Sequence, residues 1–346
     1  MKKFFIKLFL ISIILFYILS SFSTLLASTS TNEPETYSKY IVCIERTTSQ
    51  VLYEKDAYTK TPMASTTKIM TAIIALENCE LTEQVEVSSD AANVSGSTLG
   101  LTAESTVSME ALLYGLLICS GNDCAVAIAE YIGGSIEGFA DLMNDKATNL
   151  GLVNTHFVTP HGLDDDNHYT TAYDLAILTN YALDNEKFKE IVGIKTTTIM
   201  VGEYSRTITN TNEVLGNTEG VYGVKTGFTA NAGRCLVTAC KIDNLDIIIV
   251  VLGADTKEIR GLDTNNIIEY IYSNFEMVDT YETIINAFEK FKENQNITVT
   301  KSLSEPEISL ADNFTYTYPI NKNEVQNLKT SIYTVTRIKC RHFTKF

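Results

Sequence analysis

The sequence is short of basic residues, and this shortage excludes one broad class of function. It holds 27 lysines and arginines against 42 aspartates and glutamates, a formal net charge of −15. Three of the lysines lie in the first seven residues, so the remainder carries 24 − 42 = −18. Such a surface repels nucleic acid, and no basic stripe with interleaved aromatic residues offsets it. We therefore expect no nucleic-acid partner.

The cysteine and histidine patterns that hold metals are also missing. None of the seven cysteines forms a C-x-x-C pair, which excludes zinc-ribbon and thioredoxin-like sites. No His-Glu-x-x-His motif occurs. The odd number of cysteines and their apolar neighbours predict buried, reduced thiols with at most one disulfide, and a chain of 346 residues can bury a core without a disulfide framework. We expect no metal and no cofactor.

The N-terminus has the layout of a secretory signal peptide. Three lysines in the first seven residues precede an uncharged apolar run from Leu8 to Leu19, and small residues follow near Ala27. Residues 1–27 are therefore expected to be a signal peptide. The uncharged stretch from Leu8 to Thr31 is also long enough to span a bilayer, so a retained anchor is the alternative. With either, the chain is expected to be exported, to the outer face of the cell membrane or the cell wall.

Strand patterns lie at both ends of a central helical region. The N-terminal pair, Tyr40–Glu45 and Gln50–Glu54, is a predicted hairpin, and a helix is predicted over 257–275. The remaining strand candidates are Gly220–Thr226, Arg234–Ile242 and Asp246–Leu252. Because the strands enclose the helices in sequence, they indicate one sheet drawn from both ends, an α+β domain over residues 34–276. Alternating Thr, Val, Ile and Tyr residues predict a small β-rich domain over 277–346, short enough to be incomplete.

A lysine stands alone in the first strongly apolar helical pattern. Residues from Pro62 to Leu76 carry apolar side chains on nearly every face, which is typical of a buried helix. Ser65 falls in its first turn, and Lys68 lies three residues on, on the same face. Burial lowers the pKa of a lysine, and a neutral amine beside a serine is a general base for it. The alternative is a lysine that reaches out to water.

A second polar triplet, Ser120-Gly121-Asn122, interrupts two apolar helical patterns over Met109–Cys119 and Asp123–Ile132. Taken alone it is an ordinary helix–helix turn. At the mouth of a cleft, the same residues offer a hydroxyl for proton relay and an amide to hold a peptide. Asp123 is expected to act as a carboxylate at a helix start, with a third polar role in the site as the alternative.

The third triplet, Lys225-Thr226-Gly227, lies at the end of a predicted strand. An edge strand can pair with an extended peptide. Lys225 then brings a positive charge to a terminal carboxylate, Thr226 adds a donor, and Gly227 lets the backbone approach closely. Lys225 near Lys68 also lowers the pKa of Lys68. An exposed lysine in a hairpin is the alternative.

The three triplets together resemble the Ser-x-x-Lys, Ser-Asp-Asn and Lys-Thr-Gly set of penicillin-binding proteins and class A β-lactamases, although Gly121 stands here where the second motif has aspartate. From Thr36 to Phe275 the sequence is similar to the D-alanyl-D-alanine carboxypeptidases, low-molecular-weight penicillin-binding proteins of serine peptidase family S11. The segments Pro160–Asp164 and Gly223–Val237 add to the likeness. The resemblance implies a β-lactamase/transpeptidase-like fold with an antiparallel sheet and a helical region.

The resemblance also implies the site and the reaction. The implied catalytic residues are Ser65 as the acylated nucleophile, Lys68 as its base and Ser120 as a proton relay; the implied substrate-binding residues are Asn122, Lys225, Thr226 and Gly227. The oxyanion hole is expected to use the Ser65 amide and a strand amide beyond Gly227. Arg260 is expected either to help bind the carboxylate or to form a surface salt bridge. The implied reaction removes the terminal D-alanine from peptidoglycan stem peptides, with β-lactams as covalent inhibitors.

Two departures from the family and three rival functions stay open at this point. Many members end in an amphipathic helix on the membrane, but this C-terminus shows no sustained helical period, which leaves peripheral membrane association open. Phe228 follows Lys-Thr-Gly where some relatives carry histidine. The rivals are a class A-like β-lactamase, which needs a deacylating glutamate that is not evident here, a non-catalytic peptidoglycan-peptide binding module, and a zinc peptidase. The last would use His156, His161, Asp164 and His168.

Overall fold

The computed structural model describes residues 33–279 and 317–321. The predicted leader, residues 1–27, lies outside the described residues. So do residues 280–316 and 322–346 of the predicted β-rich domain. Among the described residues, no helix is both long and apolar enough to cross a membrane. The six cysteines in the described part of the chain are free thiols, and Cys340 lies outside it.

One antiparallel sheet of five strands forms the centre of the domain, in the order β2-β1-β9-β8-β7. Its strands are β1 (Tyr40–Glu45), β2 (Val51–Lys55), β7 (Val221–Thr229), β8 (Gly233–Ile242) and β9 (Leu245–Ala254). The first strand of the chain pairs with the last of the five, from Tyr40 opposite Leu252 to Glu45 opposite Ile247. The predicted sheet drawn from both ends of the domain is therefore confirmed, and β7 forms one of its two edges.

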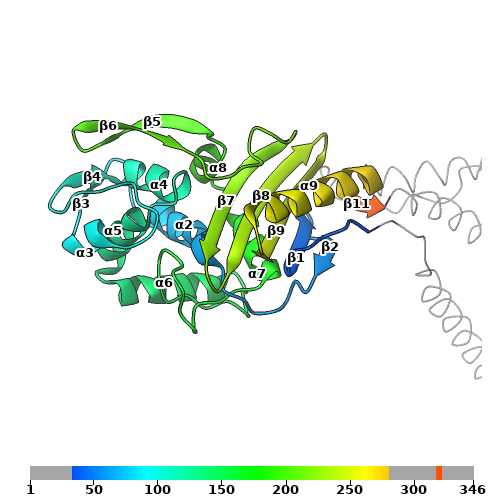
Figure 1. Ribbon diagram of the computed structural model, residues 1–346, viewed down its shortest axis with the longest axis horizontal. Coiled ribbons are helices and arrows are strands. Elements are labelled where there is room, and N and C mark those ends of the chain that lie inside the picture. Colours follow the sequence, from blue (N-terminus) through cyan, green and yellow to red (C-terminus); the bar gives the residue numbers. More distant parts are fainter. Residues whose placement is uncertain (1–32, 280–316, 322–346) are drawn as a thin grey trace, which may run out of the picture. The chain divides into compact units, whose positions relative to one another are not determined.

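The alternation of side chains along β9 explains why both faces of the sheet are covered. Ile248 and Val250 belong to the large core between the sheet and the helical region. Ile247 and Ile249 belong to a second core on the other face. Because successive residues of a strand point to opposite faces, an uninterrupted apolar run buries both. In Figure 1, α9 (Lys257–Asn274) lies across one face of the sheet, and the helical region lies against the other.

The helical region is built between β2 and β7. Its helices are η1 (Ala64–Thr67), α2 (Lys68–Asn78), α3 (Ser89–Asn93), α4 (Met109–Leu117), α5 (Asn122–Gly133), α6 (Ile136–Asn149), α7 (Ala172–Ala182) and α8 (Glu186–Val192). Two small hairpins accompany them: β3 (Gln84–Glu86) with β4 (Thr106–Ser108), and β5 (Thr196–Val201) with β6 (Tyr204–Thr209). A separate strand pair joins β10 (Phe275–Asp279) to β11 (Thr317–Asn321). The β-rich domain over 277–346 stays a prediction beyond this pair.

The sequence pattern places one helix start wrongly. A single helix over Pro62–Leu76 is predicted, whereas the structure begins at Ala64 with one 3₁₀ turn and continues as α2 to Asn78. Ala64 has a φ of 49°, in the left-handed region that residues other than glycine seldom adopt. The chain therefore turns sharply immediately before Ser65, and this turn shapes the site.

Candidate active site

The 3₁₀ turn brings the first two candidate residues together. In a 3₁₀ helix, side chains three residues apart eclipse one another. Lys68 therefore lies over Ser65, and its Nζ donates to the Ser65 Oγ at 2.8 Å. Thr66 and Thr67 hold the turn, because their hydroxyls donate to the carbonyls of Met63 at 2.6 Å and Ala64 at 2.8 Å.

Lys68 is fully buried, and its ammonium is fully partnered. Besides Ser65, it donates to the Asn122 Oδ1 at 2.7 Å and to the His161 carbonyl at 2.9 Å. Burial lowers the pKa of Lys68 well below its ordinary value, and the nearby positive charge of Lys225 lowers it further. The alternative of a lysine that reaches out to water is wrong. An amine held on a serine hydroxyl with a lowered pKa is suited to accept that hydroxyl's proton.

Asn122 and Ser120 come from the break between α4 and α5. Asn122 opens α5, and its Nδ2 donates to the Ser95 carbonyl at 2.6 Å, so its amide orientation is fixed on both sides. Ser120 is buried, with a left-handed φ of 63°. Its hydroxyl has no hydrogen-bond partner among the described residues. The structure therefore connects Asn122 directly to Lys68 and leaves the Ser120 hydroxyl available.

Asp123 has the structural role expected of a carboxylate at a helix start. It lies in the first turn of α5 and is fully buried. Its two oxygens accept the backbone N–H groups of Leu99 at 2.9 Å, Gly100 at 2.7 Å and Leu101 at 3.0 Å. These bonds fold the 95–101 loop onto the start of α5, beside Asn122.

The third triplet lies within the edge strand β7 and faces the nucleophile turn. Lys225 is 1% exposed, and its Nζ has one hydrogen-bond acceptor among the described residues, the Thr226 carbonyl at 3.0 Å. Burial lowers the pKa of Lys225 to about 7. The alternative of an exposed hairpin lysine is wrong. At Gly227 an added Cβ would lie 3.0 Å from the Ser65 amide nitrogen and 3.0 Å from the Ala64 Cβ.

The contact at Gly227 gives a prediction about the strand and the nucleophile turn. Gly227→Ala should lower the rate of Ser65 acylation at least about tenfold, because the methyl group must push β7 and the turn apart. Gly261→Ala, in the interior of α9, is the matched control. Its Cβ would make an ordinary contact at 3.7 Å, so acylation should be unchanged. Stopped-flow measurement of acylation checks both, and equal rates in the two variants would contradict the prediction.

The histidines are engaged in holding loops. His168 is buried; its Nδ1 accepts the Val158 N–H at 2.9 Å, and its Nε2 lies 2.8 Å from the Thr67 Oγ1. Burial lowers the pKa of His168 to about 4 and that of His161 to about 3, so both rings are neutral near pH 7. Across 33–279 and 317–321, no three His, Cys, Asp or Glu side chains gather as metal ligands. The four residues of the zinc alternative therefore form no metal cluster.

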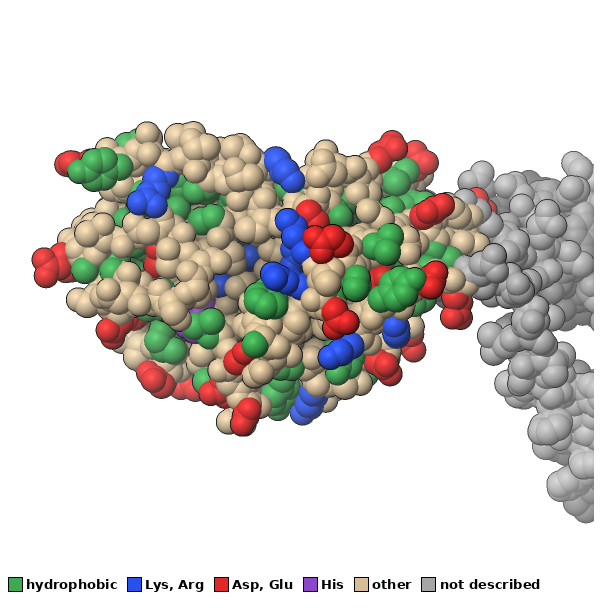
Figure 2. Space-filling model, viewed as in Figure 1, with side chains coloured by type: hydrophobic (Ala, Val, Ile, Leu, Met, Phe, Trp, Pro, Cys, Tyr) green, Lys and Arg blue, Asp and Glu red, His purple; other side chains and the backbone are tan. Residues whose placement is uncertain are grey.

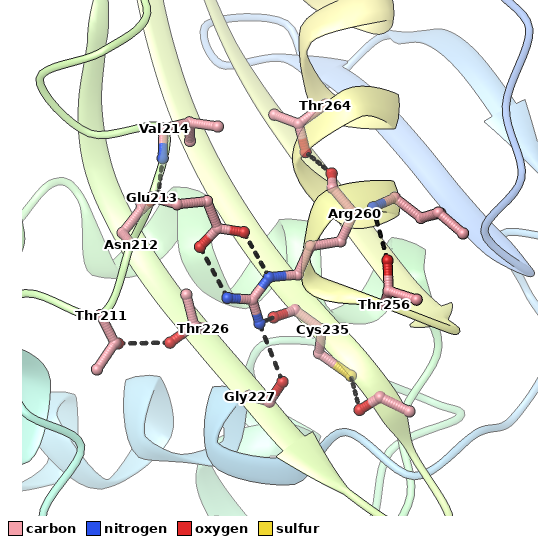
Figure 3. Close-up of polar contacts among 12 residues, drawn as sticks. Thr211, Asn212, Glu213, Val214, Thr226, Gly227, Cys235, Thr256, Arg260 and Thr264 are labelled. Carbon is pink, nitrogen blue, oxygen red and sulfur yellow. Dashed lines mark hydrogen bonds and ion pairs between the residues drawn. The ribbon is translucent and has the colours of Figure 1, made fainter.

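Arg260 is not a surface residue. The residue is 4% exposed, and its side chain forms a two-bond ion pair with Glu213, from Nε to Oε1 at 2.7 Å and from Nη2 to Oε2 at 2.7 Å. Figure 3 shows this pair between α9 and the segment before β7. The expectation of a surface salt bridge is corrected to a partly buried one, with Arg260 buried and Glu213 20% exposed, because Arg260 lies on the face of α9 that packs on the sheet.

Thr211 is a residue of the site region that the motifs do not indicate. Its hydroxyl lies 2.5 Å from that of Thr226, and its backbone N–H donates to the Ile118 carbonyl at 3.3 Å. Thr211 therefore joins the end of α4, two residues before Ser120, to the Lys-Thr-Gly strand. Figure 3 shows its contact with Thr226. No spacing or composition signal in the sequence marks this contact.

The geometry and a comparison of families lead to the same assignment. Residues 27–256 match the family described as D-alanyl-D-alanine carboxypeptidase, Peptidase S11. The chain belongs to this family.

The surface charge agrees with the acidic composition. Acidic side chains are spread around the outline of the visible face, and lysine and arginine form no continuous stripe there (Figure 2).

Named S11 relatives are similar over most of the chain. The D-alanyl-D-alanine carboxypeptidase DacF of Bacillus subtilis is 36% identical over 258 residues, which cover 73% of this chain and 66% of DacF. DacC of Escherichia coli is 34% identical and is matched over 73% of this chain and 65% of DacC. The chain thus spans about two thirds of the length of these relatives.

Solved structures confirm the predicted fold. The D-alanyl-D-alanine carboxypeptidase DacD from Francisella tularensis aligns with a TM-score of 0.70 at 26% identity, over 88% of this chain and 86% of that one. The Streptomyces K15 DD-transpeptidase aligns with a TM-score of 0.66 at 32% identity, over 69% of this chain and 98% of that one. The α+β, transpeptidase-like architecture expected from the sequence is therefore correct.

Proposed function

We propose that the protein is an exported serine D-Ala-D-Ala carboxypeptidase that removes the terminal D-alanine from peptidoglycan stem peptides and is acylated by β-lactams. The observation that carries the proposal is the 2.8 Å contact between the buried Lys68 Nζ and the Ser65 Oγ. A serine beside an amine of lowered pKa is an activated nucleophile. Family membership supplies the substrate class.

The edge strand β7 supports one arrangement of the substrate. A stem peptide that pairs antiparallel with β7 lays its C-terminal end beside Lys225 and Thr226 and its upstream residues beside Phe228 and Thr229. A carboxylate at Lys225 gives this buried ammonium a charged partner and raises its pKa from about 7, so that the charged form is favoured once substrate is bound. The scissile carbonyl then lies at Ser65, next to Gly227.

The reaction proceeds through an ester on Ser65. Lys68 takes the hydroxyl proton as the Ser65 Oγ attacks the carbonyl carbon of the penultimate D-alanine. The C–N bond then breaks, the proton passes to the departing amine by way of the Ser120 hydroxyl, and D-alanine leaves. Asn122 holds Lys68 and the peptide. Water hydrolyses the ester, which releases the shortened peptide and restores the serine.

Two measurements on the purified protein test this proposal. One is free D-alanine after incubation with a peptide that ends in D-Ala-D-Ala, and the other is the mass of Ser65 peptides after treatment with penicillin. The carboxypeptidase releases D-alanine and forms a stable adduct at Ser65. Rapid hydrolysis of penicillin without a lasting adduct would instead establish a β-lactamase. If the protein neither releases D-alanine nor reacts with penicillin, the non-catalytic binding module is the remaining alternative. The mass of the mature N-terminus reports whether the leader is removed.

The β-lactamase alternative is weaker on the geometry. It requires a glutamate that activates the deacylating water. The hydrogen-bond partners of Lys68 among the described residues are a hydroxyl, an amide and a carbonyl, with no carboxylate. Peripheral membrane association stays a prediction.

A further inference from the structure

Most N–H donors of the Arg260 guanidinium already have hydrogen-bond partners within the protein. Two of its N–H groups bind Glu213, and a third nitrogen donates to the carbonyls of Cys235 at 3.1 Å and Gly227 at 3.4 Å. A guanidinium has five N–H donors, so four are occupied. Arg260 is also 4% exposed. It therefore has little left to offer a substrate carboxylate.

The Gly227 carbonyl that Arg260 binds belongs to a peptide group of particular importance. In a planar trans peptide, the carbonyl of one residue and the N–H of the next point in opposite directions. The Gly227 carbonyl is turned inward, toward Arg260, and lies opposite Cys235 of β8. The Phe228 N–H is therefore turned outward, toward the free edge of the sheet. Figure 3 shows one terminal nitrogen of the guanidinium, Nη1, joined to both the Gly227 and the Cys235 carbonyl.

The outward N–H lies next to the nucleophile. The backbone at Gly227 passes so near Ser65 that an added Cβ would lie 3.0 Å from the Ser65 amide nitrogen. Two backbone N–H groups, of Ser65 and Phe228, thus flank the place where the carbonyl oxygen of an acylated Ser65 must lie. Paired amides of this kind stabilise the negative oxygen of a tetrahedral intermediate.

We propose that Arg260, held in place by Glu213, is a positioning residue for the oxyanion hole and not a carboxylate-binding residue. Its positive charge on the Gly227 carbonyl fixes the orientation of the Gly227–Phe228 peptide and polarises it, which strengthens the Phe228 N–H as a donor. Glu213 aligns the guanidinium through two bonds and balances its buried charge. This inference rests on the proposed acyl transfer at Ser65.

The two roles of Arg260 predict different losses with two substrates. One substrate is an N-acylated D-Ala-D-Ala peptide; the other is a D-alanyl thioester whose leaving group carries no carboxylate. Arg260→Lys should lower the acylation rate on both by a similar factor, about 10- to 100-fold, because both form the same oxyanion. Glu213→Gln, which keeps the guanidinium and the side-chain shape, should cause a smaller loss of the same kind. Thr226→Val is the matched control. Its acylation rate should fall only with the peptide, because Thr226 is proposed to bind the carboxylate that the thioester's leaving group does not have.

A spectroscopic measurement separates positioning from a merely structural role. The infrared stretch of the ester carbonyl in the penicillin-acylated enzyme falls as the oxyanion hole polarises it, so Arg260→Lys and Glu213→Gln should raise this frequency. Thermal unfolding midpoints are recorded alongside. A loss confined to the carboxylate-bearing peptide, or a lowered midpoint with unchanged acylation and carbonyl frequency, would overturn the inference while the wild type still acylates both substrates. If the wild type acylates neither, the proposed function itself fails.

Discussion

Ser65→Ala should abolish both D-alanine release and covalent labelling by penicillin. The variant keeps Lys68, Lys225 and the backbone donors but has no oxygen to form the ester. Removing a nucleophile of this kind lowers turnover by at least about 10³-fold. Labelling should fall below detection, because the adduct is the serine ester itself. Mass spectrometry of the penicillin-treated protein and a D-alanine assay measure the two losses.

A second serine supplies the control for this experiment. Ser135 caps the N-terminus of α6, where its Oγ accepts the Gly138 N–H at 3.0 Å. Ser135→Ala should lower stability by about 1 kcal/mol, as the loss of a helix cap does, and should leave labelling intact. Labelling that persists in Ser65→Ala, or disappears equally in Ser135→Ala, would contradict the assignment of Ser65 as the nucleophile.

Much of the sheet could be predicted from local sequence because its strands obey simple periodicity. Tyr40–Glu45 is found with the predicted bounds, and the strand predicted over Arg234–Ile242 begins one residue earlier, at Gly233. Both strands are bounded by turn residues and carry β-branched and apolar side chains, which is the strongest local signal for a strand. The three triplets could be found because their chemistry needs fixed residue types at fixed spacing.

The contacts that complete the site could not be predicted, because they join residues without any local pattern. Arg260 and Glu213 are 47 positions apart, and Thr211 and Thr226 are joined by hydroxyls that any pair of exposed threonines could offer. The helical pattern over 257–275 also does not indicate whether the charged side chain of Arg260 lies on the buried or the exposed side of α9. The 3₁₀ turn at Ala64 could not be predicted for a different reason. An apolar run favours an α-helix and gives no information about the backbone conformation of its first residues.

Lys68→Ala should fold and bind substrate but acylate about 10²- to 10⁴-fold more slowly, the range that a general base contributes. Lys68→Arg is the more informative partner variant, because arginine keeps the positive charge and cannot release its proton at neutral pH. If Lys68 serves as a base, both variants lose acylation. If it serves as a fixed charge, Lys68→Arg retains most of the activity.

The assignment of Lys68 as the base also predicts the direction in which the acylation rate changes with pH. The protonated amine cannot accept the Ser65 proton, so the wild-type rate should rise with pH through the pKa of Lys68 and then level off. Since burial and Lys225 lower the pKa of Lys68 well below 10.5, the rise should finish well below the pH at which an ordinary lysine loses its proton.

The lowered pKa of Lys68 also affects stability, because the folded state holds this proton less tightly than the unfolded state. The free energy of unfolding of the wild type should therefore increase with pH between the lowered pKa and 10.5, relative to that of Lys68→Ala. Single-turnover acylation and thermal unfolding, each measured across pH for both proteins, test the two expectations. An acylation rate that falls with pH across this range, or one that is unchanged in Lys68→Ala, would remove Lys68 from the base role.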